Sequence, residues 1–179
     1  WVVILAGRPG MGKTSFALEV ALNFAHDGVP SLVCSQEMQS GQLIDRAIAI
    51  EGRLELSKVI AGEMTEEEHE KFQFGLSRIA DIPLFIDEQG ALRIEDVRRK
   101  ARQVQREAGG RLGLVVIDFL QLMVAEGENR TREMTAITGA LKALAKELRV
   151  PILALSQLNR SVENRTNKRP VMADLRESG

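Results

Sequence analysis

The stretch LAGRPGMGKTS, from Leu5 to Ser15, is the most informative segment of this sequence. The phosphate-loop pattern G-x-x-x-x-G-K-[ST] is matched in it by Gly7, Gly12, Lys13 and Thr14. An apolar run, WVVILAG, leads into the pattern, and a helical stretch from Thr14 to Ala25 follows it. This strand–loop–helix order is the context that the motif requires, and it argues against a chance match. The segment therefore predicts an α/β protein that binds a nucleoside triphosphate.

Each residue type in this loop suits contact with phosphates. The glycines let backbone N–H groups surround phosphate oxygens, and the N-terminus of the following helix faces the negative charge. The Lys13 ammonium would reach the β- and γ-phosphates, and the Thr14 hydroxyl would bind Mg²⁺. We therefore expect ATP to contact the loop at Gly7, Arg8, Pro9, Gly10, Met11, Gly12, Lys13, Thr14 and Ser15.

Short apolar runs alternate with helical stretches along the 179 residues, a length that suits one domain. The runs WVVILA, SLVCS, PLFID, LGLVVID and PILALS are rich in Val, Ile and Leu, as the strands of buried parallel sheets are. Helices separate them, and one of these begins with a capping box formed by Thr65 and Glu68. We predict an α/β fold with a mostly parallel central sheet flanked by helices on both faces.

Composition narrows the range of partners. The net charge of −1 excludes a global basic field, so a nucleic-acid site would have to be a local patch. One cysteine, Cys34, excludes a disulfide framework and fits a reducing, cytoplasmic environment. No apolar run approaches the roughly 20 residues of a membrane span, so we expect no membrane partner.

Candidates for the catalytic groups follow the apolar runs. Asp118 ends LGLVVID, where a carboxylate for Mg²⁺ would stand, but Phe119 follows, so the paired acidic residues of many phosphate-loop ATPases are missing. A base that activates water must lie elsewhere, and Glu37 and Glu88 both follow strand candidates at the nucleotide side of a parallel sheet. Position alone leaves both open. Gln157 ends ILALSQ and is an amide suited to sensing a γ-phosphate.

Basic residues gather in two places. The segment NRSVENRTNKRPVMADLRESG is polar and non-periodic, which indicates a loop after Gln157. Its cations suit a phosphate backbone and its lack of Phe, Tyr and Trp disfavours base stacking, although a solvated loop explains the charge equally well. The other group lies in a regular helical context and is interpreted as a solvated face: Arg98, Arg99, Lys100, Arg102 and Arg106.

Several segments together resemble a known family. GRPGMGKTSFALEVA, CSQEM and LVVIDFLQLM occur in this order, and a final block runs from LKALAKEL through ALSQLNRSVE to DLRESG. The combination is similar to the RecA-like motor domain of the DnaB-type replicative helicases of bacteria and phages, over essentially the whole chain. The family usually has ARPSMGKT where this chain has GRPGMGKT, which still fits the general loop pattern.

The resemblance implies a role for each matching position. Lys13 and Thr14 would hold phosphate and Mg²⁺, and Asp118 would be the carboxylate on the metal side. Glu37, in the S-x-E-M position, would be the catalytic base in preference to Glu88, and Gln157 would be the γ-phosphate sensor. The loop ending in DLRESG would touch single-stranded DNA, with the predicted DNA-binding residues Arg160, Arg165, Lys168, Arg169, Arg176, Glu177 and Gly179.

The resemblance also implies an assembly. Six such domains would form a ring with ATP between neighbours, and a primase and a helicase loader would be partners. Residues 1–179 would be one motor domain of a longer protein, with an arginine finger after Gly179 and an N-terminal domain and linker helix before Trp1. Two alternatives remain open: a RecA-, RadA- or clock-type ATPase that does not unwind DNA, and a nucleotide-binding module without motor activity. A small-molecule kinase is disfavoured because no Arg-rich lid is present.

Overall fold

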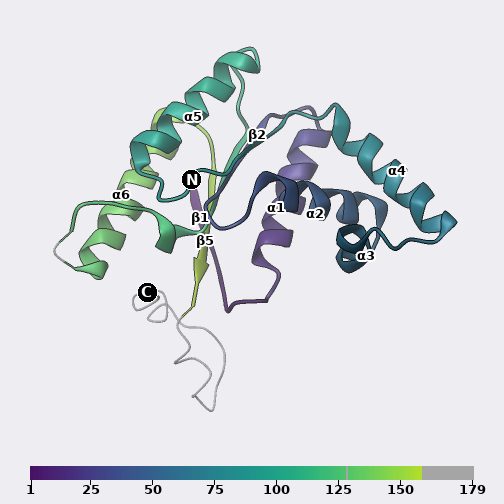
Figure 1. Cartoon of the computed structure of the whole chain (residues 1–179). Helices are drawn as coiled ribbons and strands as arrows, with labels where there is room; N and C mark the ends of the chain where they lie inside the picture. The colour runs from purple at the N-terminus through teal and green to yellow at the C-terminus, as the bar shows by residue number, and fades with distance from the viewer. Residues whose placement is uncertain (128, 159–179) are drawn as a thin grey trace.

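A single parallel sheet forms the centre of the protein in a computed structural model that describes residues 1–127 and 129–158 (Figure 1). The described strands pair in the order β1-β5-β4-β2-β3, and every pair is parallel. The predicted fold class is therefore confirmed. The strands are β1 (Val2–Gly7), β2 (Ser31–Ser35), β3 (Leu84–Asp87), β4 (Leu114–Asp118) and β5 (Ile152–Gln157).

Helices connect these strands and lie on both sides of the sheet (Figure 1). Two short elements were not predicted, the helix α3 and the 3₁₀ turn η1, because six and three residues are too few to show a helical period. None of the helices within the described ranges is long and apolar enough to cross a membrane. Their bounds are α1 (Lys13–His26), α2 (Ser40–Gly52), α3 (Leu56–Ala61), α4 (Glu66–Ala80), α5 (Ile94–Glu107), η1 (Leu120–Leu122) and α6 (Arg130–Leu148).

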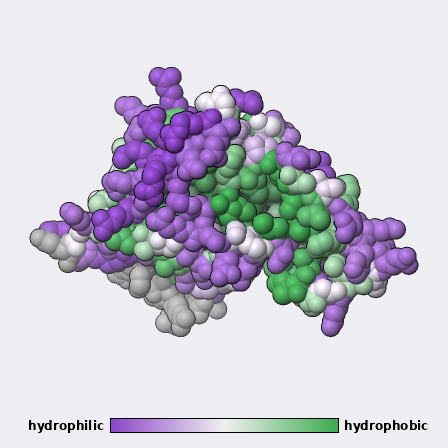
Figure 2. Space-filling view, turned by 45° about the horizontal axis from the view of Figure 1, so that its top comes forward, coloured by the Kyte–Doolittle hydropathy of each residue, from purple (hydrophilic) through white to green (hydrophobic). Residues whose placement is uncertain are grey.

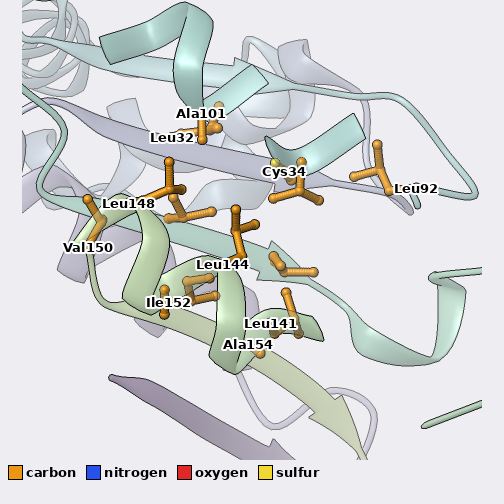
Figure 3. Packing of buried hydrophobic residues seen from close by; sticks show 14 of the residues in the cluster. Leu32, Cys34, Leu92, Ala101, Leu141, Leu144, Leu148, Val150, Ile152 and Ala154 are labelled. Carbon is orange, nitrogen blue, oxygen red and sulfur yellow. The ribbon is translucent and has the colours of Figure 1, made fainter. Parts of the chain in front are cut away.

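Alternation along β4 shows how the sheet buries both faces. Val115 and Ile117 belong to a cluster with α5 and α6, whereas Leu114 and Val116 belong to a cluster with α1 and α2. Successive side chains of a strand point to opposite faces, so a continuous apolar run is what a sheet covered on both sides requires. Figure 3 shows the α6 side of this packing, where Leu141 and Leu144 face Ile152 and Ala154.

Helix α4 packs mainly on α2 and forms an outer layer (Figure 1). The two helices approach closely at Gly52 and Gly75, where a Cβ on Gly75 would lie 2.6 Å from the carbonyl oxygen of Ile48. The predicted capping box at the start of α4 is confirmed. The Glu68 amide donates to the Thr65 hydroxyl at 3.3 Å, and the Thr65 amide donates to the Glu68 carboxylate at 3.0 Å.

The basic residues of α5 are largely neutralised by carboxylates, as their interpretation as an outer face predicts. Figure 2 shows hydrophilic residues over the part of the surface where α5 lies in Figure 1. The salt bridges there join Arg98 and Arg102 to Glu147, Arg99 to Asp96, and Lys100 to Asp87. The hydrogen bonds from Arg102 and Arg98 lower the pKa of Glu147. This face therefore offers little free positive charge for a nucleic acid.

Candidate nucleotide-binding site

The strand order brings the carboxyl ends of β1, β5, β4 and β2 to one edge of the sheet. In open parallel sheets, ligands bind at this edge. A cavity of about 500 Å³ lies here, and six of the nine predicted loop residues line it. Its lining consists of Pro9, Gly10, Gly12, Lys13, Thr14, Ser15, Glu37, Met38, Arg46, Asp118, Phe119 and Gln157.

The phosphate loop joins β1 to α1 in a tight path. Gly10 and Gly12 have φ values of 74° and 77°, in the left-handed region that favours glycine. The Lys13 ammonium folds back over the loop and donates to the Arg8 carbonyl at 2.9 Å. Gly7, Arg8 and Met11 belong to the loop but do not line the cavity. The backbone therefore has the shape that curls around phosphates, with the lysine at its centre.

Thr14 and Asp118 meet at the floor of the cavity. The Thr14 hydroxyl donates to Asp118 Oδ2 at 2.7 Å, and Asp118 is only 5% exposed. Burial raises the pKa of this carboxyl, while the Thr14 hydrogen bond acts in the opposite direction. Burial lowers the pKa of Lys13, and the charges of Asp118 and Glu37 oppose that shift. A hydroxyl and a carboxylate beside a phosphate loop are the oxygen ligands that suit Mg²⁺. Within the described ranges, no group of three or more His, Cys, Asp or Glu side chains is placed to hold a metal ion.

Glu37 lies in the cavity on a turn that is held from both sides. Its neighbour Gln36 extends the β2–β4 ladder by donating its amide to the Asp118 carbonyl at 2.8 Å, and its side chain donates to the Phe119 carbonyl at 3.1 Å. The Ser35 hydroxyl accepts from the Met38 amide at 3.1 Å on the other side. The short backbone segment that carries Glu37 is therefore fixed relative to Asp118.

Glu88 lies outside this cavity. It follows β3, which is the far edge strand of the sheet. Its Oε2 accepts a hydrogen bond from the Ser40 amide at 2.5 Å, at the N-terminus of α2, and this contact lowers the pKa of Glu88. Of the two carboxylates that sequence position left open, Glu37 lines the cavity and Glu88 caps a helix.

Arg46 is a cavity residue that the sequence analysis missed. It projects from α2, and its Nη1 donates to the Ser15 hydroxyl at 3.4 Å. Its Nε is buried without a hydrogen-bond partner. An arginine in GQLIDRAIAI resembles an ordinary solvated residue, but it lies three positions after the buried Leu43 and directly before the buried Ala47. Its position beside buried residues was the sequence signal that could have identified Arg46 as a cavity residue.

Of the other predicted residues, Gln157 lies within the described residues and the predicted DNA-binding residues do not. Gln157 lies at the end of β5 and lines the cavity. The predicted DNA-binding residues lie outside the described residues, so the structure does not test them: Arg160, Arg165, Lys168, Arg169, Arg176, Glu177 and Gly179.

Known proteins match this chain over nearly its whole length. Residues 2–179 match the family model for the DnaB-like helicase C terminal domain. The chain is 46% identical to the replicative DNA helicase DnaB of Nostoc sp. over 99% of its own length and 20% of that protein. It is 42% identical to the DnaB of Geobacillus stearothermophilus, covering 40% of that protein. The chain thus spans about a fifth to two fifths of these relatives.

Solved structures agree with this match. A DnaB-like replicative helicase, solved in a study of its interactions with primase, superimposes with a TM-score of 0.92 and is 36% identical. The match covers all of this chain and 43% of that one. An ATPase domain of known structure also superimposes with a TM-score of 0.92, over 99% of this chain and 64% of its own length. The chain belongs to the family of DnaB-like helicase C-terminal domains.

Proposed function

We propose that this chain is the ATP-hydrolysing motor domain of a replicative DNA helicase. The observation that carries the proposal is the cavity in which Lys13, Thr14, Glu37, Asp118 and Gln157 converge from four neighbouring strand ends. These side chains come from separate segments of the sequence, which the fold brings to one edge of the sheet. Their chemical types are those that phosphoryl transfer to water requires.

The residues divide the work of hydrolysis. Lys13 exchanges the Arg8 carbonyl for the β- and γ-phosphate oxygens. Thr14 and Asp118 would hold Mg²⁺, which would neutralise charge on the phosphates. Glu37 accepts a proton from the attacking water as the oxygen bonds to the γ-phosphorus and the bond to the β–γ bridging oxygen breaks. The products are ADP and inorganic phosphate.

The mechanical output begins at Gln157. Its side chain contacts the γ-phosphate before hydrolysis and loses that contact afterwards. The loss of this contact is transmitted along the chain into residues 159–179. The cations of this segment bind the backbone of single-stranded DNA without sequence specificity. The loop releases the strand and binds it again further along, which moves the protein along one strand and separates the duplex.

The working assembly is a homo-hexameric ring with ATP at each junction between neighbours. An arginine finger from the neighbour completes each site, a contribution of roughly 10³–10⁵ in rate in related enzymes. A primase and a helicase loader are its protein partners, and a solved relative has been studied for its interactions with primase.

The experiment measures ATP turnover by the full-length protein, with and without a single-stranded oligonucleotide. Glu37→Gln should abolish turnover and retain ATP binding, because the amide cannot accept the proton. Glu88→Gln is the matched control, since Glu88 caps α2 outside the cavity, and it should stay active. Retained activity in Glu37→Gln would refute the assignment of the base.

A forked-duplex substrate separates the proposal from its alternative. A helicase unwinds the fork while it hydrolyses ATP. A RecA- or RadA-like ATPase shows DNA-stimulated turnover without strand separation, and a nucleotide-binding module shows neither.

A further inference from the structure

The end of β5 is held by a side chain where its neighbouring strand has already ended. Strand β4 stops at Asp118, and the chain then turns into η1. Gln121, in η1, turns its side-chain amide toward β5. Its Nε2 donates to the Gln157 carbonyl at 3.0 Å, and its Oε1 accepts from the Gln157 amide at 3.2 Å.

These two hydrogen bonds replace the backbone pairing that β4 no longer offers to the end of β5. In a parallel ladder, the N–H and C=O groups of one residue face the same neighbouring strand. Those of Gln157 face the β4 side, while the next amide, of Leu158, donates to the Gly7 carbonyl on β1 at 3.2 Å. The carboxamide of Gln121 has an acceptor oxygen and an NH₂ group with two donors, so it can pair with an N–H and a C=O as a peptide group does. It also donates to the Ser156 hydroxyl at 2.9 Å.

Gln121 is itself anchored independently of its side chain. Leu120, just before it, and Met123, two residues after it, are each 2% exposed, and the Arg130 guanidinium donates to the Gln121 carbonyl. Arg130 is held in turn by Glu133 on α6. Replacing the side chain of Gln121 therefore removes the contacts to β5 and leaves η1 in place.

We propose that Gln121 is a positioning residue that holds Gln157 at the cavity. The contact of Gln157 with the nucleotide then depends on the turn η1 that follows Asp118. The effect of Gln121 on turnover rests on the proposed function. Without these two hydrogen bonds, the amide and carbonyl of Gln157 lose their partners on the β4 side, while the bond from the Leu158 amide to Gly7 on β1 remains. The Gln157 side chain then samples positions away from the phosphate. Nucleotide binding, which depends on Lys13 and Thr14, is unaffected.

Hydrogen exchange tests whether the Gln121 side chain holds the Gln157 backbone, without reference to activity. In Gln121→Leu, the Gln157 amide should exchange faster by at least about tenfold, because it has lost its acceptor. Gln103→Leu makes the same chemical change on the exposed face of α5, where Gln103 pairs with Glu107, and should leave that amide unchanged. Unchanged exchange at Gln157 in Gln121→Leu overturns the proposal.

Kinetics of the full-length protein test the consequence. Misplacement of a reacting group costs up to about 100-fold, so kcat for DNA-stimulated turnover should fall about 10- to 100-fold while KM for ATP stays within about twofold. Gln121→Glu keeps an acceptor for the Gln157 amide and should recover part of the loss. In a Gln157→Ala background, Gln121→Leu should have no further effect, since it acts through that side chain. Additive losses overturn the proposal.

The two proposals fail in different ways. If the unmodified protein hydrolyses no ATP, the proposed function falls, and hydrogen exchange alone decides whether Gln121 holds Gln157. If the unmodified protein is active and Gln121→Leu matches it in kcat, only the positioning role is refuted.

Discussion

The hydroxyl of Thr14 donates to the carboxylate of Asp118 at 2.7 Å, although 104 positions separate the two residues in the sequence. Thr14 lies in the first turn of α1, and Asp118 ends β4. Their contact places a buried carboxylate beside the phosphate loop. A buried charge is costly unless it is compensated, so this arrangement is expected to reduce stability in favour of function.

Asp118→Asn should therefore stabilise the domain while it abolishes turnover. The amide oxygen still accepts from Thr14, and no charge is buried. We expect a gain of about 1 kcal/mol, or ~2–4 °C in Tm for a domain of this size. Thermal unfolding monitored by circular dichroism measures the difference, and a lower Tm would contradict it.

The same substitution has a defined pH dependence. Because the pKa of Asp118 is raised in the folded protein, folding favours its protonated form. That contribution is full below the pKa of the unfolded chain and is lost as the pH rises through the folded pKa. The stability gain of Asp118→Asn should thus be largest at neutral pH and vanish in acid. Melting curves across this range test the sign.

Arg46→Gln should weaken nucleotide binding. Its guanidinium lines the cavity and carries a buried Nε without a partner, so a phosphate oxygen is the ligand that its charge favours. We expect a loss of about tenfold in affinity, or ~1.4 kcal/mol. Titration with a fluorescent ATP analogue measures the loss. Arg99→Gln, on the surface of α5, is the control, and equal affinities in the two variants would contradict the prediction.

Alanine at two helical glycines should change stability in opposite directions. A Cβ on Gly75 would lie 2.6 Å from the Ile48 carbonyl oxygen and 2.9 Å from the Gly52 amide nitrogen, so α4 must move off α2. That overpacking costs about 1–3 kcal/mol. At Gly139 on α6 nothing lies within 4 Å, and alanine should stabilise by up to ~1 kcal/mol. Urea midpoints measure both, and a stabilising Gly75→Ala would show that the helices separate freely.

The Cys34 thiol should be unreactive in the folded protein. It is fully buried beneath α5, and burial raises its pKa to about 12. The thiolate is the reactive form, so a disulfide reagent should modify Cys34 only on unfolding. The rate of modification at pH 8 should match the rate of unfolding. Rapid labelling of the native protein would contradict this expectation.

Local patterns in the sequence predicted the fold and much of the candidate site. The glycines and lysine of the phosphate loop all lie within the one short segment from Gly7 to Lys13, and their conformation depends on near neighbours in the chain. Asp118 could be predicted because it ends a continuous apolar run, and a strand end is itself a local signal. The alternation of strands and helices predicted a sheet covered on both faces, because burial of both faces leaves continuous apolar runs.

The sequence by itself determined that a phosphate loop, a strand-end carboxylate and a parallel sheet are present. Only the tertiary structure decided which distant side chains meet them. Strand order places Glu37 next to Asp118 and Glu88 at the outer edge, packing of α2 brings Arg46 into the cavity, and the turn after β4 brings Gln121 to Gln157. These contacts depend on how elements far apart in the chain pack, which no local periodicity records.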